Sequence, residues 1–148
     1  MLISLLFAAV VTSLFSFSPI GGEGFEILLN NNVIMQRFGE KKMNEVQSIH
    51  LTLQQANQPV TVNYHHCGKV AKNRIIRLKN RQGKMVKEWR FADAATAVAA
   101  MTCQVKDILH ANKGKEGTFN LFYTSSELPT GRLLSLVVVS QNTLAVNK

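Results

Sequence analysis

Residue types that can bind metal ions are concentrated in the middle of the chain. Residues 64–67 read Tyr-His-His-Cys, and Met101 and Cys103 follow a short distance later. Imidazole, thioether and thiolate groups are ligands that copper and zinc take in proteins. On neighbouring strands, His65, His66 and Met101 would therefore be candidate ligands of a small metal-handling protein. Adjacent residues of a strand point to opposite faces, however, which argues against both histidines binding one ion.

The two cysteines, Cys67 and Cys103, are predicted to form a disulfide. An even number of cysteines in a chain with an export signal favours pairing, and the bond would close a loop of roughly 37 residues. The chain-entropy model assigns about 4 kcal/mol to such a bond. A disulfide would remove both thiolates as metal ligands. Only His65, His66 and Met101 would then remain as candidate ligands in the alternative function of metal handling. His66 beside Cys67 does not provide the geometry of a catalytic pair, because sequence neighbours on a strand rarely face each other.

No catalytic pattern is recognisable in the sequence. The nine acidic residues are scattered, and Asp93 and Asp107 stand beside predicted turns or helix ends, where carboxylates usually accept backbone hydrogen bonds. The sequence contains neither a nucleophile elbow nor a phosphate-binding loop nor a dinucleotide fingerprint. We therefore predict a protein that is not an enzyme and that has no resident cofactor.

Basic side chains are concentrated between residues 69 and 90. Nine of the 17 Lys and Arg residues lie in these 22 positions, with Glu88 as the single acid. On a hairpin they would form a cationic ribbon able to contact anionic lipid, an anionic polysaccharide or another envelope protein. The alternative is a solvated face that prevents aggregation. The candidate contact residues are Arg74, Arg77, Lys79, Arg81, Lys84 and Lys87.

The N-terminal segment has the composition of a secretory signal peptide. Residues 2–17 are almost continuously apolar, Pro19 and Gly21 follow as breakers, and no ionisable side chain occurs in residues 1–22. We predict a signal peptide over residues 1–18, with cleavage between 18 and 24; an uncleaved anchor or a buried N-terminal element are the alternatives. The location would then be extracytoplasmic, periplasmic or secreted. A net charge of +8 would belong entirely to the mature domain, and export makes nucleic acid the least accessible anionic partner.

The hydrophobic pattern predicts an all-β domain. Alternating or β-branched runs, with Asn-rich and Gly-containing turns, indicate eight or nine strands. Only the Ala-rich segment after Asp93 has helical character. We expect one domain over residues 19–148, a small antiparallel β-sandwich of immunoglobulin-like or jelly-roll-like organisation, with at most one short helix. The predicted strands are residues 25–29, 33–38, 48–53, 60–64, 74–79, 85–91, 101–105, 118–123 and 133–139, and the predicted helix is residues 93–100.

Overall fold

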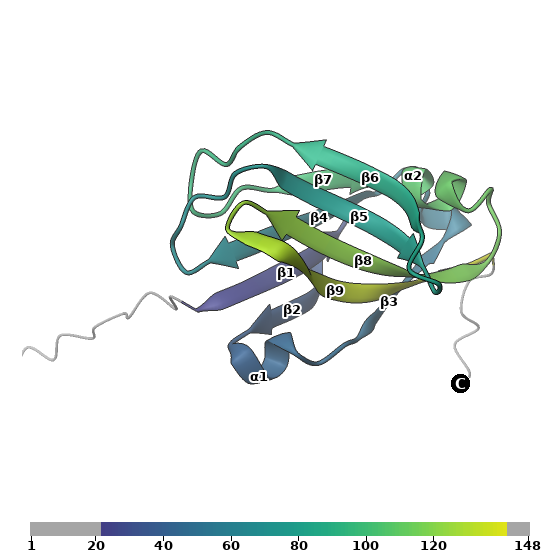
Figure 1. Ribbon diagram of the computed structural model, residues 1–148. Coiled ribbons are helices and arrows are strands. Elements are labelled where there is room, and N and C mark those ends of the chain that lie inside the picture. Colours follow the sequence, from purple (N-terminus) through teal and green to yellow (C-terminus); the bar gives the residue numbers. More distant parts are fainter. Residues whose placement is uncertain (1–21, 142–148) are drawn as a thin grey trace, which may run out of the picture.

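The computed structural model describes residues 22–141, and within them the chain is a two-layered β-sandwich (Figure 1). The predicted signal peptide, residues 1–18, lies outside the described residues. The first sheet has the order β2-β1-β4-β7 and contains β1 (Glu23–Leu29), β2 (Asn32–Phe38), β4 (Pro59–His66) and β7 (Met101–Gln104). The second has the order β3-β9-β8-β5-β6 and contains β3 (Ser48–Thr52), β5 (Arg74–Asn80), β6 (Met85–Phe91), β8 (Gly117–Ser125) and β9 (Leu128–Ser140).

The core lies between the inner faces of the two sheets. In β4 every second residue is buried, which places Val60, Val62, Tyr64 and His66 inside. In β8 the same alternation buries Phe119, Leu121, Tyr123 and Ser125. Burying a large apolar side chain contributes about 1.5–3 kcal/mol, so these inner rows supply much of the stability of the fold. The prediction of a mostly β sandwich is confirmed.

Both predicted hairpins form. The β1–β2 turn has positive φ at Asn30 and Asn31, 50° and 64°, as a two-residue turn of type I′ requires. Asn tolerates this conformation better than most residues, which explains the three-Asn sequence at this point. The β5–β6 turn contains Gly83 with φ of 79°, and a register shift follows Leu78 in β5.

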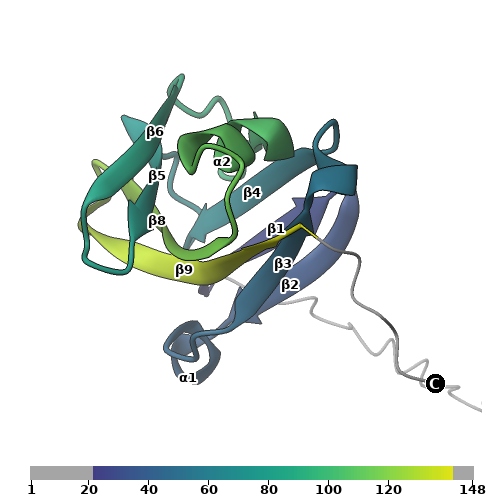
Figure 2. The same ribbon diagram turned by 90° about the vertical axis from the view of Figure 1, so that its right-hand side faces the viewer.

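The helices differ from the prediction. Residues 93–100 form no helix, whereas α1 (Glu40–Met43), the 3₁₀ turn η1 (Leu53–Gln55) and α2 (Val105–Ala111) are present. The helix α2 begins inside the predicted strand 101–105 and buries Val105, Ile108 and Leu109, a spacing that gives a helix one apolar face. Figure 2 views the molecule from the end that α2 covers. The expectation of at most one short helix is therefore wrong.

The prediction of an antiparallel sandwich is wrong at one edge of the second sheet. Strand β3 pairs with β9 in parallel, with Ile49 opposite Val137 and Leu51 opposite Val139. The chain leaves the first sheet after β2, passes through α1 and enters the edge of the second sheet. A hairpin would make β3 antiparallel to the strand before it. Because this connection crosses from one sheet to the other, β3 can instead run parallel to β9, its neighbour in the second sheet.

The predicted disulfide is also wrong, because Cys67 and Cys103 are both free. In the β4–β7 register Cys103 lies opposite Val60. Cys67 follows the last residue of β4, seven positions beyond Val60, which corresponds to roughly 23 Å at the rise of an extended strand. A disulfide needs Cα atoms within about 7 Å, so the register separates the two thiols although the strands are neighbours.

Candidate functional site

The β5–β6 hairpin brings basic side chains to one end of the sandwich. Arg81 and Lys84 are exposed in its turn, and the Arg81 guanidinium donates to the Thr118 hydroxyl at 3.3 Å. This contact holds the turn beside the loop that leads from α2 into β8, where Lys113 and Lys115 are also exposed. We call Arg81, Lys84, Lys113 and Lys115 the cationic end.

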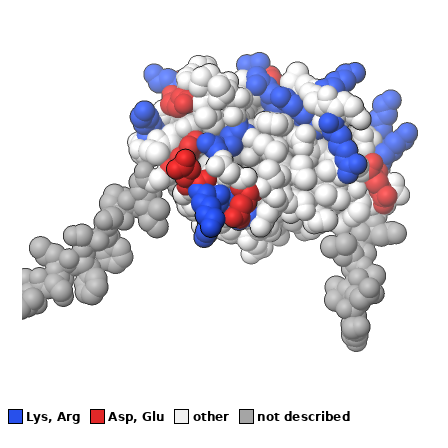
Figure 3. All heavy atoms as spheres, turned by 60° about the horizontal axis from the view of Figure 1, so that its bottom comes forward, with Lys and Arg blue, Asp and Glu red and all other residues white. Residues whose placement is uncertain are grey.

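The opposite end of the sandwich carries a different charge balance. Its loops contain four exposed lysines, Lys41, Lys42, Lys69 and Lys72, and four acids, Glu40, Glu45, Asp93 and Glu127. The turn and loops around the cationic end contain five bases but only two acids. The bases are Arg81, Lys84, Lys106, Lys113 and Lys115, and the acids are Asp107 and Glu116. Figure 3 shows mainly basic side chains at the right-hand end of the molecule and basic and acidic side chains mixed at the left-hand end.

Arg74 does not lie on the predicted ribbon. Its side chain is on the inner side of β5 and the residue is only 6% exposed. Its guanidinium donates to the Ala92 carbonyl through Nε and Nη2, at 2.9 and 2.7 Å, and to the Ala99 carbonyl through Nη1 at 2.6 Å. These bonds fix the connection between β6 and β7, so the role of Arg74 is structural.

Arg77 lies on the outer face of the second sheet but is neutralised there. Its Nε is 2.8 Å from Glu88 Oε2, and Arg90 binds the other oxygen of Glu88 at 2.7 Å. The hydrogen bond from Arg77 holds the pKa of Glu88 below its ordinary value. This three-residue ion-pair cluster therefore adds less positive field to the outer face than its two arginines suggest.

Lys79 and Lys87 lie on opposite faces of the second sheet. Lys79 shares the face of Arg77, and its Nζ is 4.5 Å from the centroid of the Phe122 ring. Lys87 is paired with Leu78, and its Nζ lies 6.0 Å from the Trp89 ring. The predicted residues therefore do not form one continuous ribbon. Lys113 and Lys115 were missed, although their Lys-Gly-Lys-Glu-Gly context marks an exposed basic loop.

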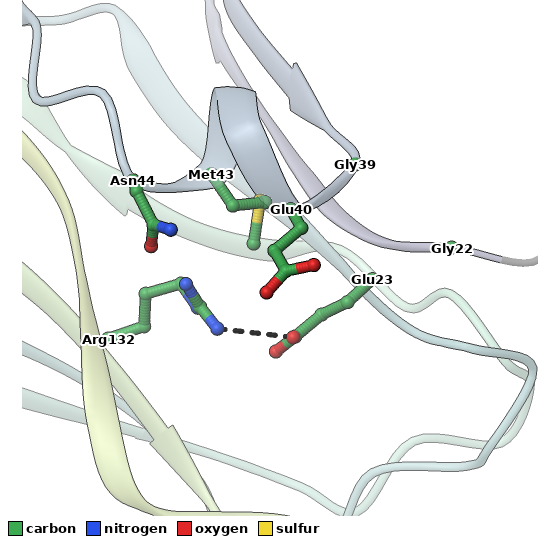
Figure 4. A pocket seen from close by; sticks show the side chains of 7 residues that line it. All are labelled: Gly22, Glu23, Gly39, Glu40, Met43, Asn44 and Arg132. Atoms are coloured by element: carbon green, nitrogen blue, oxygen red, sulfur yellow. Dashed lines mark hydrogen bonds and ion pairs between the residues drawn. The ribbon is translucent and has the colours of Figure 1, made fainter.

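A polar cleft of about 400 Å³ opens at the other end of the sandwich (Figure 4). It lies where β1 begins, next to α1 and the early part of β9. The lining residues are Gly22, Glu23, Gly39, Glu40, Met43, Asn44 and Arg132.

An ion pair and a tyrosine form the base of this cleft. Arg132 Nη2 lies 3.1 Å from Glu23 Oε2, and Arg132 Nε donates to the Tyr64 hydroxyl at 3.0 Å. The Tyr64 hydroxyl in turn donates to Glu23 Oε1. Burial, together with the Glu23 carboxylate, raises the pKa of Tyr64 far above its ordinary value, so the phenol stays neutral. Each group in this triad thus holds the other two in place.

The polar network continues inward from Tyr64. Its ring stacks on that of Tyr123, with centroids 4.4 Å apart, and the Tyr123 hydroxyl is 2.9 Å from His66 Nε2. His66 is 6% exposed, and burial lowers its pKa; Lys69 lowers it further, whereas the charges of Glu127 and Glu23 oppose the shift. A second hollow, of about 290 Å³, lies beside His66 and is lined by Glu23, His66, Cys67, Lys69, Glu127 and Leu128.

The structure does not bring the three alternative metal ligands together. His66 points into the core, whereas His65 lies on the outer face of β4, where its ring meets the edge of Phe38 at 5.1 Å. Met101 is buried opposite Val62, four residues and roughly 13 Å along β4 from His66. Among residues 22–141, no group of three His, Cys, Asp or Glu side chains is arranged to hold a metal ion.

Comparison with known proteins finds no matching family model and no significantly similar curated protein. Within residues 22–141, none of the helices has the length and apolar character needed to cross a membrane.

Proposed function

We propose that this protein is an exported, non-enzymatic binding module of the cell envelope that contacts an anionic lipid or glycan surface through its cationic end. The observation that carries the proposal is the segregation of charge. The cationic end has an excess of bases, whereas the loops at the opposite end are balanced. The apolar leader over residues 1–18 supports the extracytoplasmic location.

The local geometry makes these charges available to a partner. Arg81, Lys84, Lys113 and Lys115 are all exposed, and none of them joins the ion pairs found between residues 22 and 141. The Arg81–Thr118 contact links the β5–β6 turn to the start of β8, directly after the loop that carries Lys113 and Lys115. At physiological ionic strength the Debye length is about 8 Å, so charges on adjacent loops act together on a surface that touches both. Each basic residue near an anionic membrane contributes about 1 kcal/mol.

The test compares two variants that lose the same charge at opposite ends. One replaces Arg81, Lys84, Lys113 and Lys115 with Gln, and the matched control replaces Lys41, Lys42, Lys69 and Lys72 with Gln. All eight side chains are exposed, so both variants should fold. Binding is measured by sedimentation with phosphatidylglycerol vesicles and, in a separate arm, with an anionic polysaccharide, at low and high salt.

We expect the first variant to lose up to about 4 kcal/mol of binding free energy, close to a thousandfold in affinity. The control should keep most of its binding, and high salt should weaken the wild type. The lipid and polysaccharide arms identify the source of the anionic groups. Equal loss in both variants would show that net charge alone drives association, and absence of binding to either surface at low salt would refute the proposal.

A further inference from the structure

We propose that the cleft between β1, α1 and β9 binds a small zwitterion, a compound such as an α-amino acid that carries one ammonium and one carboxylate group. This site is at the other end of the molecule from the cationic end and does not depend on it. The proposal rests on how the charged groups are distributed around the hollow of about 400 Å³.

One side of the cleft presents carboxylates. Glu23 accepts a hydrogen bond at each oxygen, from Tyr64 and from Arg132, but each carboxylate oxygen has two acceptor positions. Glu40 is exposed at the start of α1, and its carboxylate points toward Glu23 (Figure 4). An ammonium group between Glu23 and Glu40 would receive two charge-assisted acceptors.

The other side presents hydrogen-bond donors. Arg132 uses Nε for Tyr64 and Nη2 for Glu23, and a guanidinium group has five N–H donors, so further N–H groups remain for a ligand. The Asn44 side chain lies on the same side of the cleft as Arg132 in Figure 4. A ligand carboxylate would meet both groups. The fixed position of Arg132 lowers the ordering cost of binding, because the residue is already held by two partners.

The charge of the lining favours a zwitterion over a simple ion. Glu23, Glu40 and Arg132 sum to −1, with the acids on one side and the base on the other. A simple anion would be repelled by Glu40, and a simple cation would leave Arg132 and Asn44 without a ligand acceptor. Met43, the buried last residue of α1, gives the hollow an apolar wall. The volume of about 400 Å³ lies in the lower part of the range of small-molecule sites, which leaves room for a small ligand.

The experiment titrates the protein with three small probes by calorimetry and follows its melting temperature in parallel. Glycine carries both groups, ethanolamine carries only the amine, and acetate carries only the carboxylate. The variants are Glu40→Gln and Asn44→Ala, and the matched control is Glu45→Gln, an exposed acid outside the cleft. No side-chain hydrogen bond or ion pair of Glu40, Asn44 or Glu45 is found among residues 22–141, so the fold should survive each change.

We expect glycine to bind more tightly than ethanolamine or acetate. Glu40→Gln and Asn44→Ala should each weaken glycine binding on the order of tenfold, the effect of losing one hydrogen bond to a charged group, and Glu45→Gln should leave it unchanged. Equal glycine binding by Glu40→Gln and Glu45→Gln would overturn the assignment to this cleft. Equal affinity for glycine and ethanolamine, or no binding of any probe at millimolar concentration, would overturn the proposal that the ligand is a zwitterion.

Discussion

Replacing Tyr64 with Phe tests how much the polar network stabilises the fold. The change removes one hydroxyl and keeps the ring that stacks on Tyr123. Arg132 Nε then loses its acceptor, and Glu23 Oε1 loses its donor. Because the ring volume is retained, the measured effect reports on hydrogen bonding and not on a cavity.

The magnitude follows from the charge and exposure of the two partners. A hydrogen bond to a charged group contributes about 1.5–3 kcal/mol, and the hydroxyl makes two. The side chains of Arg132 and Glu23 are 24% and 34% exposed, so water replaces part of what is lost. We expect a loss of about 2–3 kcal/mol in the free energy of unfolding. In a domain of this size that corresponds to a fall in Tm of about 6–12 °C.

Tyr123→Phe is the matched control, because Tyr123 is also a buried tyrosine but its hydroxyl has an imidazole partner, His66. Loss of a hydrogen bond to a neutral group costs about 1 kcal/mol. Urea unfolding, followed by the fluorescence of the single tryptophan, Trp89, gives both values. If Tyr64→Phe destabilises the protein no more than Tyr123→Phe, the charged triad does not stabilise the fold as we argue.

Two further predictions follow from burial. Without reductant, an alkylating reagent should label Cys67, which is exposed, and should spare Cys103 until the protein unfolds, because burial raises the pKa of its thiol to about 12. Reductant should leave Tm unchanged, and mass spectrometry showing two unreactive cysteines in the native protein would contradict the free thiols. Burial also lowers the pKa of His66 in the folded state, so the unfolded state binds more protons once the pH falls below the ordinary histidine value of about 6.5. Stability should therefore be complete above that pH and decline between pH 7 and 5, by at most about 1.4 kcal/mol per pH unit. His66→Gln should flatten this dependence in urea unfolding, whereas His50→Gln, at an exposed position, should not; equal slopes in both variants would remove His66 as the cause.

Local patterns in the sequence determined most of the elements. Alternation with a period of two residues determines which side chains of an extended strand share a face, so the inner rows of β4 and β8 follow from the order of apolar and polar residues along each segment. The same rule places Arg74 on the side of Ile76 and Leu78, away from Arg77. Strand alternation therefore places Arg74 off the predicted contact surface.

The helices show where local preference is overruled by tertiary contacts. Residues 93–100 are rich in Ala, yet the Asp93 carboxylate accepts a hydrogen bond from the backbone N–H of Asn73 at 2.8 Å, and the Arg74 guanidinium donates to the carbonyl of Ala99. These bonds come from the start of β5 and the residue before it, and they hold the segment in an irregular conformation. Intrinsic helix propensity differs between residues by less than 1 kcal/mol, so such contacts outweigh it.

Only the tertiary structure decided which distant residues meet. Glu23, Tyr64 and Arg132 come from β1, β4 and β9, and the sequence separations of 41, 68 and 109 positions carry no periodic signal. The register of β4 against β7 similarly decides that Cys103 lies beside Val60 and not beside Cys67. Register and sheet packing result from the fit of the whole core, whereas a single segment specifies only its own faces and turns.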